Sequence, residues 1–414
     1  MDRRHFLASL GLFGAGAALA PAETLAASAK DVPAESGDDA LLAFPVYAQL
    51  TGADTADVRW RTRVPAVSRV EWTQDAALPR EKRANARPSR DGMIAAGELD
   101  HRVTLRGVDP AKPLIFEAFS APVEKIAPYE IRLGAERSCG ARTLRPVLDG
   151  GEVSLAVFND LHGRIDLIPG LLARPEVRAV EPALALFNGD CLDDCDTRAA
   201  VEKRFLRTLP PLSEAGRSAL FLRGNHEYRG AAARSLRAHL SPLAGGNYFG
   251  AFTLGPVRFL CVDSGEDKPD AARVYGGLVD CDAYLAAQAE FVRTETASPA
   301  WKNAPWRVAV MHIPPFSHDA ENDAWHGPAR LRRELGKTFA EAGIDLMICG
   351  HNHRCAFFPA DAGTHPYPIF VGGGPSEKSA VVALLRAAGT RLSLDAVGLG
   401  GLLPEFSLRL AKSR

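Results

Sequence analysis

Side chains that bind transition metals follow a series of apolar runs in the second half of this sequence. They are aspartate, asparagine and histidine, which offer oxygen and nitrogen donors of the kind that Fe, Zn and Mn accept. The candidate ligands are Asp160, His162, Asp190, Asn225, His312, His351 and His353. This number of donors exceeds the needs of one tetrahedral ion and suits two adjacent ions that share a bridging carboxylate. The set predicts two divalent or trivalent transition-metal ions, whose identity stays open among Fe, Zn and Mn.

Each candidate ligand stands at or just beyond the expected end of a buried strand. The apolar runs are VSLAVF before Asn159, ALALF before Asn188, ALFLR before Gly224, RVAVM before His312 and DLMIC before Gly350. From about residue 150 such runs alternate with amphipathic stretches, a pattern typical of buried sheets flanked by helices. Ligand sites in open α/β sheets lie outside the carboxyl ends of the strands, so these loops are expected to converge. Glycines 189, 224 and 350 are expected to let the backbone turn closely there.

The spacing within two of these loops favours pairs of ligands. In an extended segment, side chains two residues apart point to the same side. Asp160 with His162, and His351 with His353, are therefore each expected to face one centre.

Residues 40–148 follow a different pattern. Short runs such as Asp57–Val64 and His101–Val108 alternate polar with apolar residues and are broken by Gly, Pro and Asp. This alternation predicts an all-β sandwich with polar outer faces. At 414 residues with 46% hydrophobic content, the chain can bury a large core divided between this sandwich and an α/β domain at 150–414.

Taken in order, the ligand motifs resemble those of the calcineurin-like metallophosphoesterase superfamily over about residues 150–380. The motifs are Asp160-x-His162, Gly189-Asp190-x-x-Asp193, Gly224-Asn225-His226-Glu227, His312 and Gly350-His351-x-His353. The resemblance implies a four-layer α/β/β/α sandwich that hydrolyses phosphoesters, with a water or hydroxide between the ions as nucleophile. It also implies a division of the ligands. Asp160, His162, Asp190 and His353 would bind the first ion, Asp190 would bridge, and Asn225, His312 and His351 would complete the second.

The β-sandwich resembles the fibronectin-type-III-like domain that precedes the catalytic domain of purple acid phosphatases. Trp60-x-Thr62 and His101–Leu105 followed by Gly107 carry this likeness, which favours a phosphomonoester substrate. One position departs from those enzymes, because Asp193 stands where they have tyrosine three residues after the bridging aspartate. The tyrosinate–iron absorption band is therefore not expected. Asp193 is instead a candidate to orient a ligand histidine.

Three residues next to Asn225 are candidates for roles other than metal binding. His226 is the candidate catalytic residue, either protonating the leaving group or holding the phosphate; the alternative is a histidine that caps the next helix. Glu227 is expected to support the fold or the ligands. Arg229 is a candidate to clamp a phosphate oxygen, with a surface ion pair as the alternative.

The first residues resemble a twin-arginine export signal. Arg3 and Arg4 precede the apolar stretch Phe6–Ala20, which is too short and glycine-rich to span a bilayer, and Ala27-Ser28-Ala29 supplies a cleavage site. Residues 1–29 are thus predicted to send the protein to the periplasm or outside the cell, without stable membrane insertion after cleavage. An uncleaved N-terminal anchor is the alternative.

Composition narrows the possible partners. The 49 basic and 50 acidic residues nearly cancel and form no long run of one sign, so no nucleic acid is expected as a structural partner. The 7 cysteines form no CxxC pair, which argues against a zinc finger or a redox motif. The expected partner is a small phosphoester, and the oligomeric state is not predicted.

Together these observations predict a dinuclear metal-dependent phosphoester hydrolase that favours monoesters. Two alternatives stay open. One is a phosphodiesterase or nucleotide hydrolase of the same superfamily. The other is a cell-envelope binding protein that retains the metals without turnover.

Overall fold

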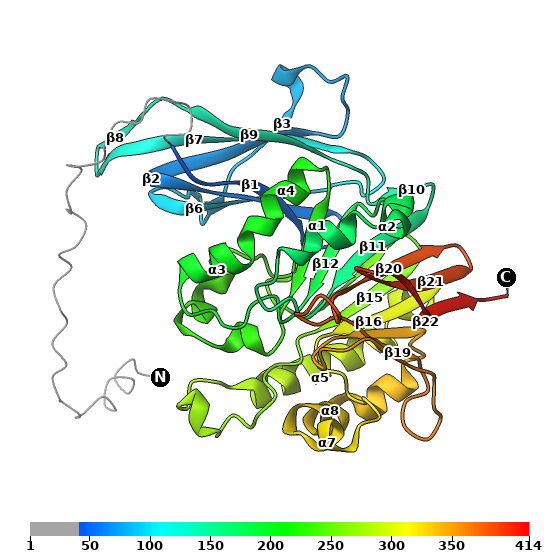
Figure 1. Ribbon diagram of the computed structural model, residues 1–414. Coiled ribbons are helices and arrows are strands. Elements are labelled where there is room, and N and C mark those ends of the chain that lie inside the picture. Colours follow the sequence, from blue (N-terminus) through cyan, green and yellow to red (C-terminus); the bar gives the residue numbers. More distant parts are fainter. Residues whose placement is uncertain (1–40, 414) are drawn as a thin grey trace, which may run out of the picture. The chain divides into compact units, whose positions relative to one another are not determined.

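Two sheets lie face to face in the computed structural model, which describes residues 41–413 (Figure 1). All the strands expected to carry metal ligands are present. They are β11 (Glu152–Phe158), β12 (Leu184–Asn188), β13 (Ser218–Leu222), β16 (Trp306–Met311) and β17 (Leu346–Cys349). The first three pair in parallel in one sheet, and β16 and β17 pair in parallel in the other. The predicted export signal at 1–29 lies outside the described residues.

Further strands widen both sheets. Beyond β11, the first sheet continues through antiparallel β20 (Val381–Ala388), β21 (Arg391–Gly398) and β22 (Gly401–Ala411). The second sheet has the order β14-β15-β16-β17-β19-β18. Its remaining strands are β14 (Gly250–Leu254), β15 (Val257–Val262), β18 (Ala356–Phe358) and β19 (Ile369–Val371).

Both faces of the two sheets are buried, which explains the uninterrupted apolar runs. Successive side chains of a strand alternate between faces. In β12, Leu184 and Leu186 pack in the core between the two sheets, whereas Ala185 and Phe187 pack under helices on the outer face. A third core lies between the second sheet and its own helices, where Met347 of β17 meets Leu331 and other residues.

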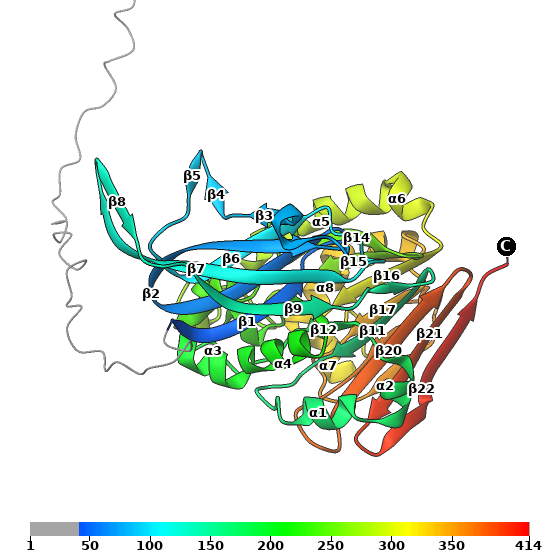
Figure 2. The same cartoon turned by 90° about the horizontal axis from the view of Figure 1, so that it is seen from above.

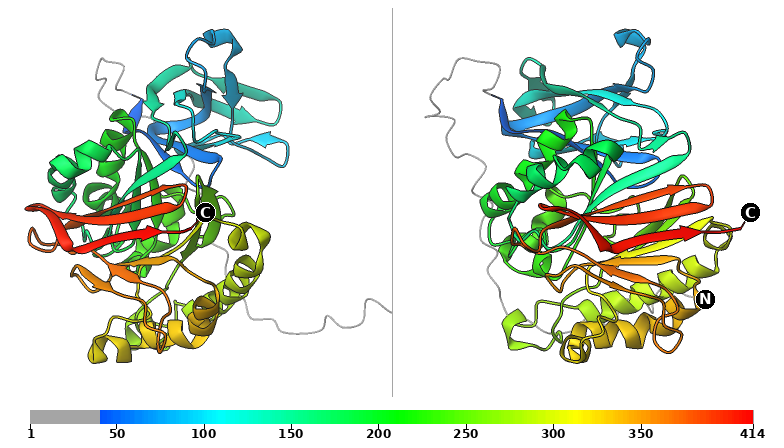
Figure 3. Two further views of the ribbon diagram at one scale, coloured as in Figure 1. Left: turned by 90° about the vertical axis from the view of Figure 1, so that its right-hand side faces the viewer. Right: turned by 45° about the vertical axis from the view of Figure 1, so that its right-hand side comes forward.

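Helices cover the outer face of each sheet (Figures 1 and 3). Those on the first sheet are α1 (Leu167–Leu172), α2 (Pro175–Val180), α3 (Arg198–Arg204) and α4 (Leu209–Glu214). The helices on the side of the second sheet are α5 (Cys281–Ala297), α6 (Pro299–Lys302), α7 (Ala320–Ala324) and α8 (His326–Glu341). Three cores between four layers confirm the predicted α/β/β/α sandwich. None of the helices in residues 41–413 has the length and apolar character needed to cross a bilayer.

Residues 41–149, here called the β region, contain strands and a single short 3-10 turn at Arg80–Lys82. The main strands are β1 (Leu42–Leu50), β2 (Thr55–Thr73), β6 (Glu98–Arg106), β7 (Leu114–Ala127) and β9 (Arg137–Leu144). The short ones are β3 (Ala84–Ala86), β4 (Ser89–Arg90), β5 (Met93–Ile94), β8 (Glu130–Leu133) and β10 (Leu148–Asp149). Figure 2 shows the long strands β2 and β7 running side by side. The all-β character agrees with the sequence pattern, whereas the likeness to fibronectin type III stays a prediction.

The residues that suggested this likeness meet in the core of the β region. Trp60 lies opposite His101 in the β2–β6 pair, and their rings stack at 5.2 Å between centroids. The Trp60 Nε1–H donates to Ser120 Oγ at 2.8 Å, and Thr62 Oγ1 lies 2.9 Å from His101 Nε2. Burial lowers the pKa of His101 to about 4. The polar atoms named here therefore all have partners inside an apolar core.

The β region shares its sheet with residues 150–413, here called the α/β region. Strand β1 runs parallel to β13, with Gln49 opposite Ala219, so one sheet extends through both regions. The buried Arg59 anchors the junction: its Nε donates to Ser241 Oγ at 2.7 Å, and its Nη1 donates to the Ala238 carbonyl at 2.7 Å. The alternating sequence pattern does not predict this continuity.

Candidate metal centre

The carboxyl ends of strands from both sheets meet at one place, and the loops that leave them carry all the predicted ligands. Two overlapping groups of ligand atoms form there, each with its atoms within 4.8 Å of one another. The first group is Asp160, His162, Asp190 and His353, and the second is Asp190, His312 and His351. Asp190 belongs to both, which is the division that the family resemblance implies.

Short distances connect the groups. Nε2 of His312 lies 3.0 Å from Oδ2 of Asp190, and Nε2 of His162 lies 3.7 Å from the same oxygen. Asn225 joins the second group, because its Oδ1 lies 3.0 Å from Nδ1 of His351. The structure thus brings together all the residues predicted to bind metal, and their occupancy by ions stays a prediction.

The backbone of the ligand loops differs from the expectation. Asp160, His162, Asp190, His351 and His353 have φ between 46° and 75°, in the left-handed region rather than the extended one. This conformation costs a residue with a side chain roughly 1–2 kcal/mol. Side chains two residues apart in such a turn need not share a side. Asp160 and His162 fall in one group, whereas His351 and His353 fall in different groups, which is the division that the family resemblance implies.

The three loop glycines are needed mainly for space. A Cβ on Gly224 would stand 2.2 Å from Oδ1 of Asp190, and one on Gly350 would stand 2.5 Å from Oδ2 of Asp160. A Cβ on Gly189 would stand 2.6 Å from Nδ1 of His312. Each contact is far shorter than van der Waals distance. The expectation of a close backbone approach is therefore confirmed, and the ligands themselves fill the space that a side chain would need.

Two buried ring nitrogens indicate that the site fits metal ions. Nδ1 of His312 lies 2.9 Å from the Asn188 carbonyl, which can only accept, so Nδ1 carries the proton. Nε2 of His312 points at Asp190 and has no hydrogen-bond partner. Nε2 of the buried His162 has none either. An unsatisfied buried imidazole nitrogen among carboxylates is the arrangement that a metal ion completes.

The charges of the site lead to the same conclusion. Burial raises the pKa of Asp160, and the neighbouring Asp190 raises it further, so it ends well above the usual value in spite of the opposing effect of His312. Burial opposes a charge on His312, but Asp190 and Asp160 outweigh it and raise the pKa of His312 to about 10. Two buried carboxylates side by side require nearby positive charge. Bound cations would supply that charge.

Asp193 and Glu227 hold the ligands, as expected of them. Oδ1 of Asp193 lies 2.9 Å from Nδ1 of His162, which fixes the ring with Nε2 toward the centre. The fully buried Glu227 accepts from three backbone N–H groups, those of Asp190, Leu192 and Gly224, at 2.9, 3.1 and 2.8 Å. Burial and the nearby Asp190 raise the pKa of Glu227 to about 7. This carboxyl group therefore joins the loops after β12 and β13.

His226 faces the centre without belonging to either group. Its ring packs edge-on against His162, with centroids 4.6 Å apart, and its Nδ1 lies 2.6 Å from the Asp193 carbonyl. Its Nε2 lies 2.9 Å from Nη1 of Arg229. Arginine only donates, so Nε2 is the acceptor in this contact. The alternative of a helix cap does not hold, because the two ring nitrogens contact the Asp193 carbonyl and Arg229 Nη1.

Arg229 is engaged in an ion pair instead of lying open to a phosphate. Its Nε and Nη2 donate to the two carboxylate oxygens of the buried Glu266, each at 3.0 Å, and Nη2 also reaches Asp267 at 3.1 Å. The remaining nitrogen of Arg229, Nη1, donates to Nε2 of His226. The ion-pair alternative is the one that the structure shows, and Arg229 acts on the site through His226.

Two asparagines at the strand ends were not among the predicted residues. Nδ2 of Asn188 donates to Oδ1 of Asn159 at 2.8 Å and to the Met311 carbonyl at 3.1 Å. The Asn188 carbonyl in turn fixes His312. These contacts tie β12 to β11 and, across the two sheets, to β16. Asparagine directly before a ligand motif, at Asn159-Asp160 and Asn188-Gly189, was the available sequence signal.

Comparison with known proteins agrees with this geometry. Residues 153–355 match the family of calcineurin-like phosphoesterases. This part of the chain is therefore similar to calcineurin-like phosphoesterases. Serine/threonine-protein phosphatase CPPED1 of Mus musculus is 29% identical over 135 residues, which are 32% of this chain and 40% of that protein. The chain thus matches less than half the length of this curated relative.

Solved structures show the same fold at low sequence identity. The purple acid phosphatase PPD1 from yellow lupin (Lupinus luteus) has a TM-score of 0.63 at 12% identity, covering 88% of this chain and 74% of that one. PhoD has a TM-score of 0.56 at 12% identity, covering 92% of this chain and 94% of that one. These likenesses concern the arrangement of the layers and carry no information on substrate.

Proposed function

We propose that this protein is a dinuclear metal-dependent phosphoester hydrolase. The observation that carries the proposal is the pair of ligand groups sharing Asp190, with imidazole nitrogens that lack any hydrogen-bond partner inside them. The residues of the two groups would hold two ions, which would supply Lewis-acid chemistry and activate a water as the nucleophile. The chain contributes the bridging carboxylate and the fixed direction of each ring.

The proposed role of His226 is to give a proton to the leaving group. Its Nδ1–H contact with the Asp193 carbonyl fixes the ring. Nε2 would first take up a proton from solvent and then pass it to the leaving oxygen of the substrate. Arg229 occupies Nε2 in the structure at 2.9 Å. A substrate oxygen must therefore displace that guanidinium before the transfer. Protonation of this kind contributes roughly 10²–10⁴-fold to a rate.

A phosphomonoester is the proposed substrate. The phosphatase name of the mouse relative supports this choice. The test is hydrolysis of p-nitrophenyl phosphate, bis-p-nitrophenyl phosphate, a phosphoserine peptide and linear and cyclic nucleotides, after loading with Mn, Zn or Fe. Faster turnover of the monoesters supports the proposal.

Each other outcome of this screen identifies an alternative. Turnover confined to the diester or to cyclic nucleotides would make the protein a phosphodiesterase. Failure of every ester, with two ions per chain by elemental analysis, would make it a metal-retaining binding protein. Activity that survives complete removal of the metals would contradict the dinuclear mechanism itself.

We further propose export through the twin-arginine route, on the basis of Arg3, Arg4 and the apolar stretch that follows them. Cell fractionation tests it. The wild-type chain is expected outside the cytoplasm, and the double variant Arg3→Lys, Arg4→Lys is expected to stay inside. Equal distribution of the two proteins would contradict the proposal.

A further inference from the structure

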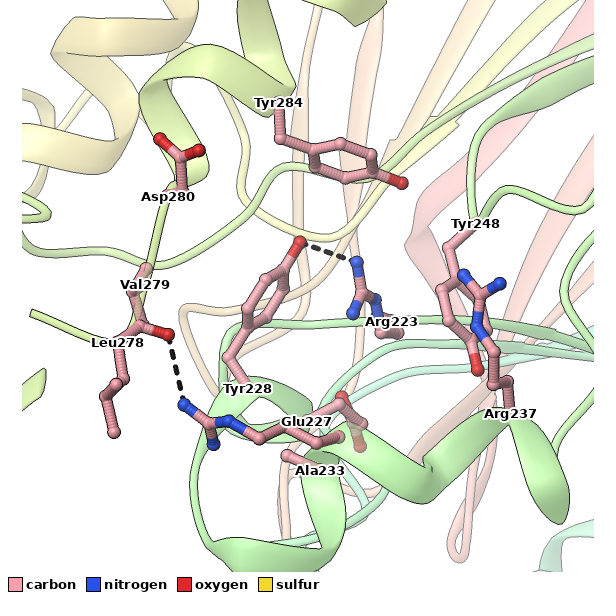
Figure 4. Close-up of a pocket in the computed structure, with 11 residues that line it drawn as sticks. Arg223, Glu227, Tyr228, Ala233, Arg237, Tyr248, Leu278, Val279, Asp280 and Tyr284 are labelled. Atoms are coloured by element: carbon pink, nitrogen blue, oxygen red, sulfur yellow. Dashed lines mark hydrogen bonds between the residues drawn. The ribbon is translucent and has the colours of Figure 1, made fainter. Parts of the chain in front are cut away.

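A cavity lies beside the candidate metal centre, on the segment that follows β13 (Figure 4). Its volume is about 490 Å³, within the range of small-molecule sites. Its walls come from the 3-10 helices His226–Tyr228 and Ala231–Ala238 and from the residues leading into α5. The lining residues that carry the argument are Arg223, Tyr228, Arg234, Arg237, Tyr248 and Tyr284. None of the predicted metal ligands lines this cavity.

One wall of the cavity is aromatic and rigid. The guanidinium carbon of Arg223 lies 4.2 Å from the ring centroid of Tyr228, 4.4 Å from that of Tyr248 and 5.8 Å from that of Tyr284. The rings are visible around it in Figure 4. Nε and Nη2 of Arg223 donate to Oδ2 of the buried Asp263 at 2.8 and 2.6 Å. Arg223 is therefore neutralised and holds the tyrosines in place.

The remaining charge of the cavity is positive. Arg234 and Arg237 are exposed, and no carboxylate of residues 41–413 lies within ion-pair distance of either. Arg234 donates from Nη2 to the Leu278 carbonyl at 3.0 Å, which keeps the guanidinium at the cavity. Glu227 also lines the cavity, but its oxygens are taken by backbone N–H groups beside the metal centre. Asp280 is the other acidic residue of the lining.

We propose that this cavity binds a small aromatic anion at a site separate from the metal centre. The ring of the ligand packs against the tyrosines, and its phosphate, phosphonate or carboxylate group pairs with Arg237 beside Tyr248 or with Arg234 beside Leu278. Arginine suits such groups because its planar fork donates two hydrogen bonds to them. The occupant contacts the turn that also carries Asn225 and His226.

The test is isothermal titration calorimetry of the metal-loaded full chain with phenylphosphonate, whose carbon–phosphorus bond an esterase does not cleave. Two binding events per chain are expected in the wild type, one at each site. The double variant Arg234→Gln, Arg237→Gln is expected to weaken one event by about tenfold or more. The control Arg207→Gln, an exposed arginine outside the cavity, should keep both events. Melting temperatures by circular dichroism verify that each variant is folded.

The Asp190→Asn variant separates this inference from the proposed function. It is expected to lose the event at the metal centre and to keep the event at the arginines, whether or not the protein is an enzyme. A single event in the wild type that disappears in Asp190→Asn would overturn the inference, as would a second event unchanged in the arginine double variant. Methylphosphonate, which has no ring, should bind the second site several-fold more weakly; equal affinity would overturn the aromatic part of the proposal.

Discussion

Buried histidines in the two regions of this molecule have opposite surroundings. In the β region, His101 is 3% exposed, stacks on Trp60 and has its Nε2 beside Thr62 Oγ1. In the α/β region, His312 is fully buried, and its Nε2 has no hydrogen-bond partner. Burial is thus common to both, and it does not by itself mark a functional site. The unsatisfied nitrogen and the left-handed backbone of the surrounding loops distinguish the metal centre.

The largest expected effect comes from the shared carboxylate. Asp190→Asn removes the negative charge common to both ligand groups, so the protein should lose both ions and nearly all turnover. Elemental analysis and p-nitrophenyl phosphate hydrolysis measure the two losses. The matched control is Asp57→Asn, a buried aspartate of the β region that accepts from Thr104 and Ser241. It should lower stability and keep the ions. If Asp190→Asn kept both ions, Asp190 would not be a shared ligand, and the buried histidines around it could not be distinguished from His101 by metal binding.

A smaller effect is expected at the histidine beside the centre. His226→Ala should keep both ions and lower turnover by roughly 10²–10⁴-fold, more severely for substrates with poor leaving groups. Rates for a series of substituted phenyl phosphates, with the metal content of each sample, provide the measurement. If this variant emptied the site, His226 would be a ligand, and its assigned role would be wrong.

A lesser effect is expected for the residue that orients His162. Asp193→Asn keeps an oxygen near Nδ1 but removes its charge, so metal affinity should fall roughly 10–100-fold. Competition with a metal chelator measures the affinity. Asp194→Asn serves as the control, because Asp194 pairs with Arg204 and not with a ligand. Equal affinities in the two variants would contradict the orienting role.

The smallest effect concerns the stability of the β region and its dependence on pH. The pKa of His101 is lowered to about 4 in the folded protein, whereas an unfolded histidine has a value of about 6.5. Between these values the unfolded chain binds a proton that the folded chain does not. Stability should therefore fall as the pH drops from 6.5 to 4, by roughly 2–3 kcal/mol from this group.

Urea unfolding at pH 7 and pH 4.5 measures this dependence, and His101→Gln should reduce it. His239, whose pKa is also lowered to about 4 by burial, contributes in the same direction. Each histidine therefore needs its own variant. The same pH dependence in wild type and His101→Gln would show that His101 is not the group responsible.

Much of the metal centre could be predicted from the sequence, because polar residues stood directly after long apolar runs. Strand ends and ligand identity are local properties of the chain. The φ values were missed, because residues other than glycine seldom adopt a left-handed backbone, although aspartate and histidine do so more often than most. The pairing of Arg229 with Glu266 was left open, because it joins residues 37 positions apart in sequence. The join between β1 and β13 was missed for the same reason, since it is a long-range contact between strands of the two regions.

That join bears on how the protein can be divided. In the intact chain β1 covers one side of β13. A fragment starting at residue 150 would leave that side as a bare row of backbone N–H and C=O groups, a surface on which other chains readily assemble. The α/β region, which contains every candidate ligand, is therefore expected to precipitate on its own. Adding the β region as a separate fragment should restore the solubility of the α/β region.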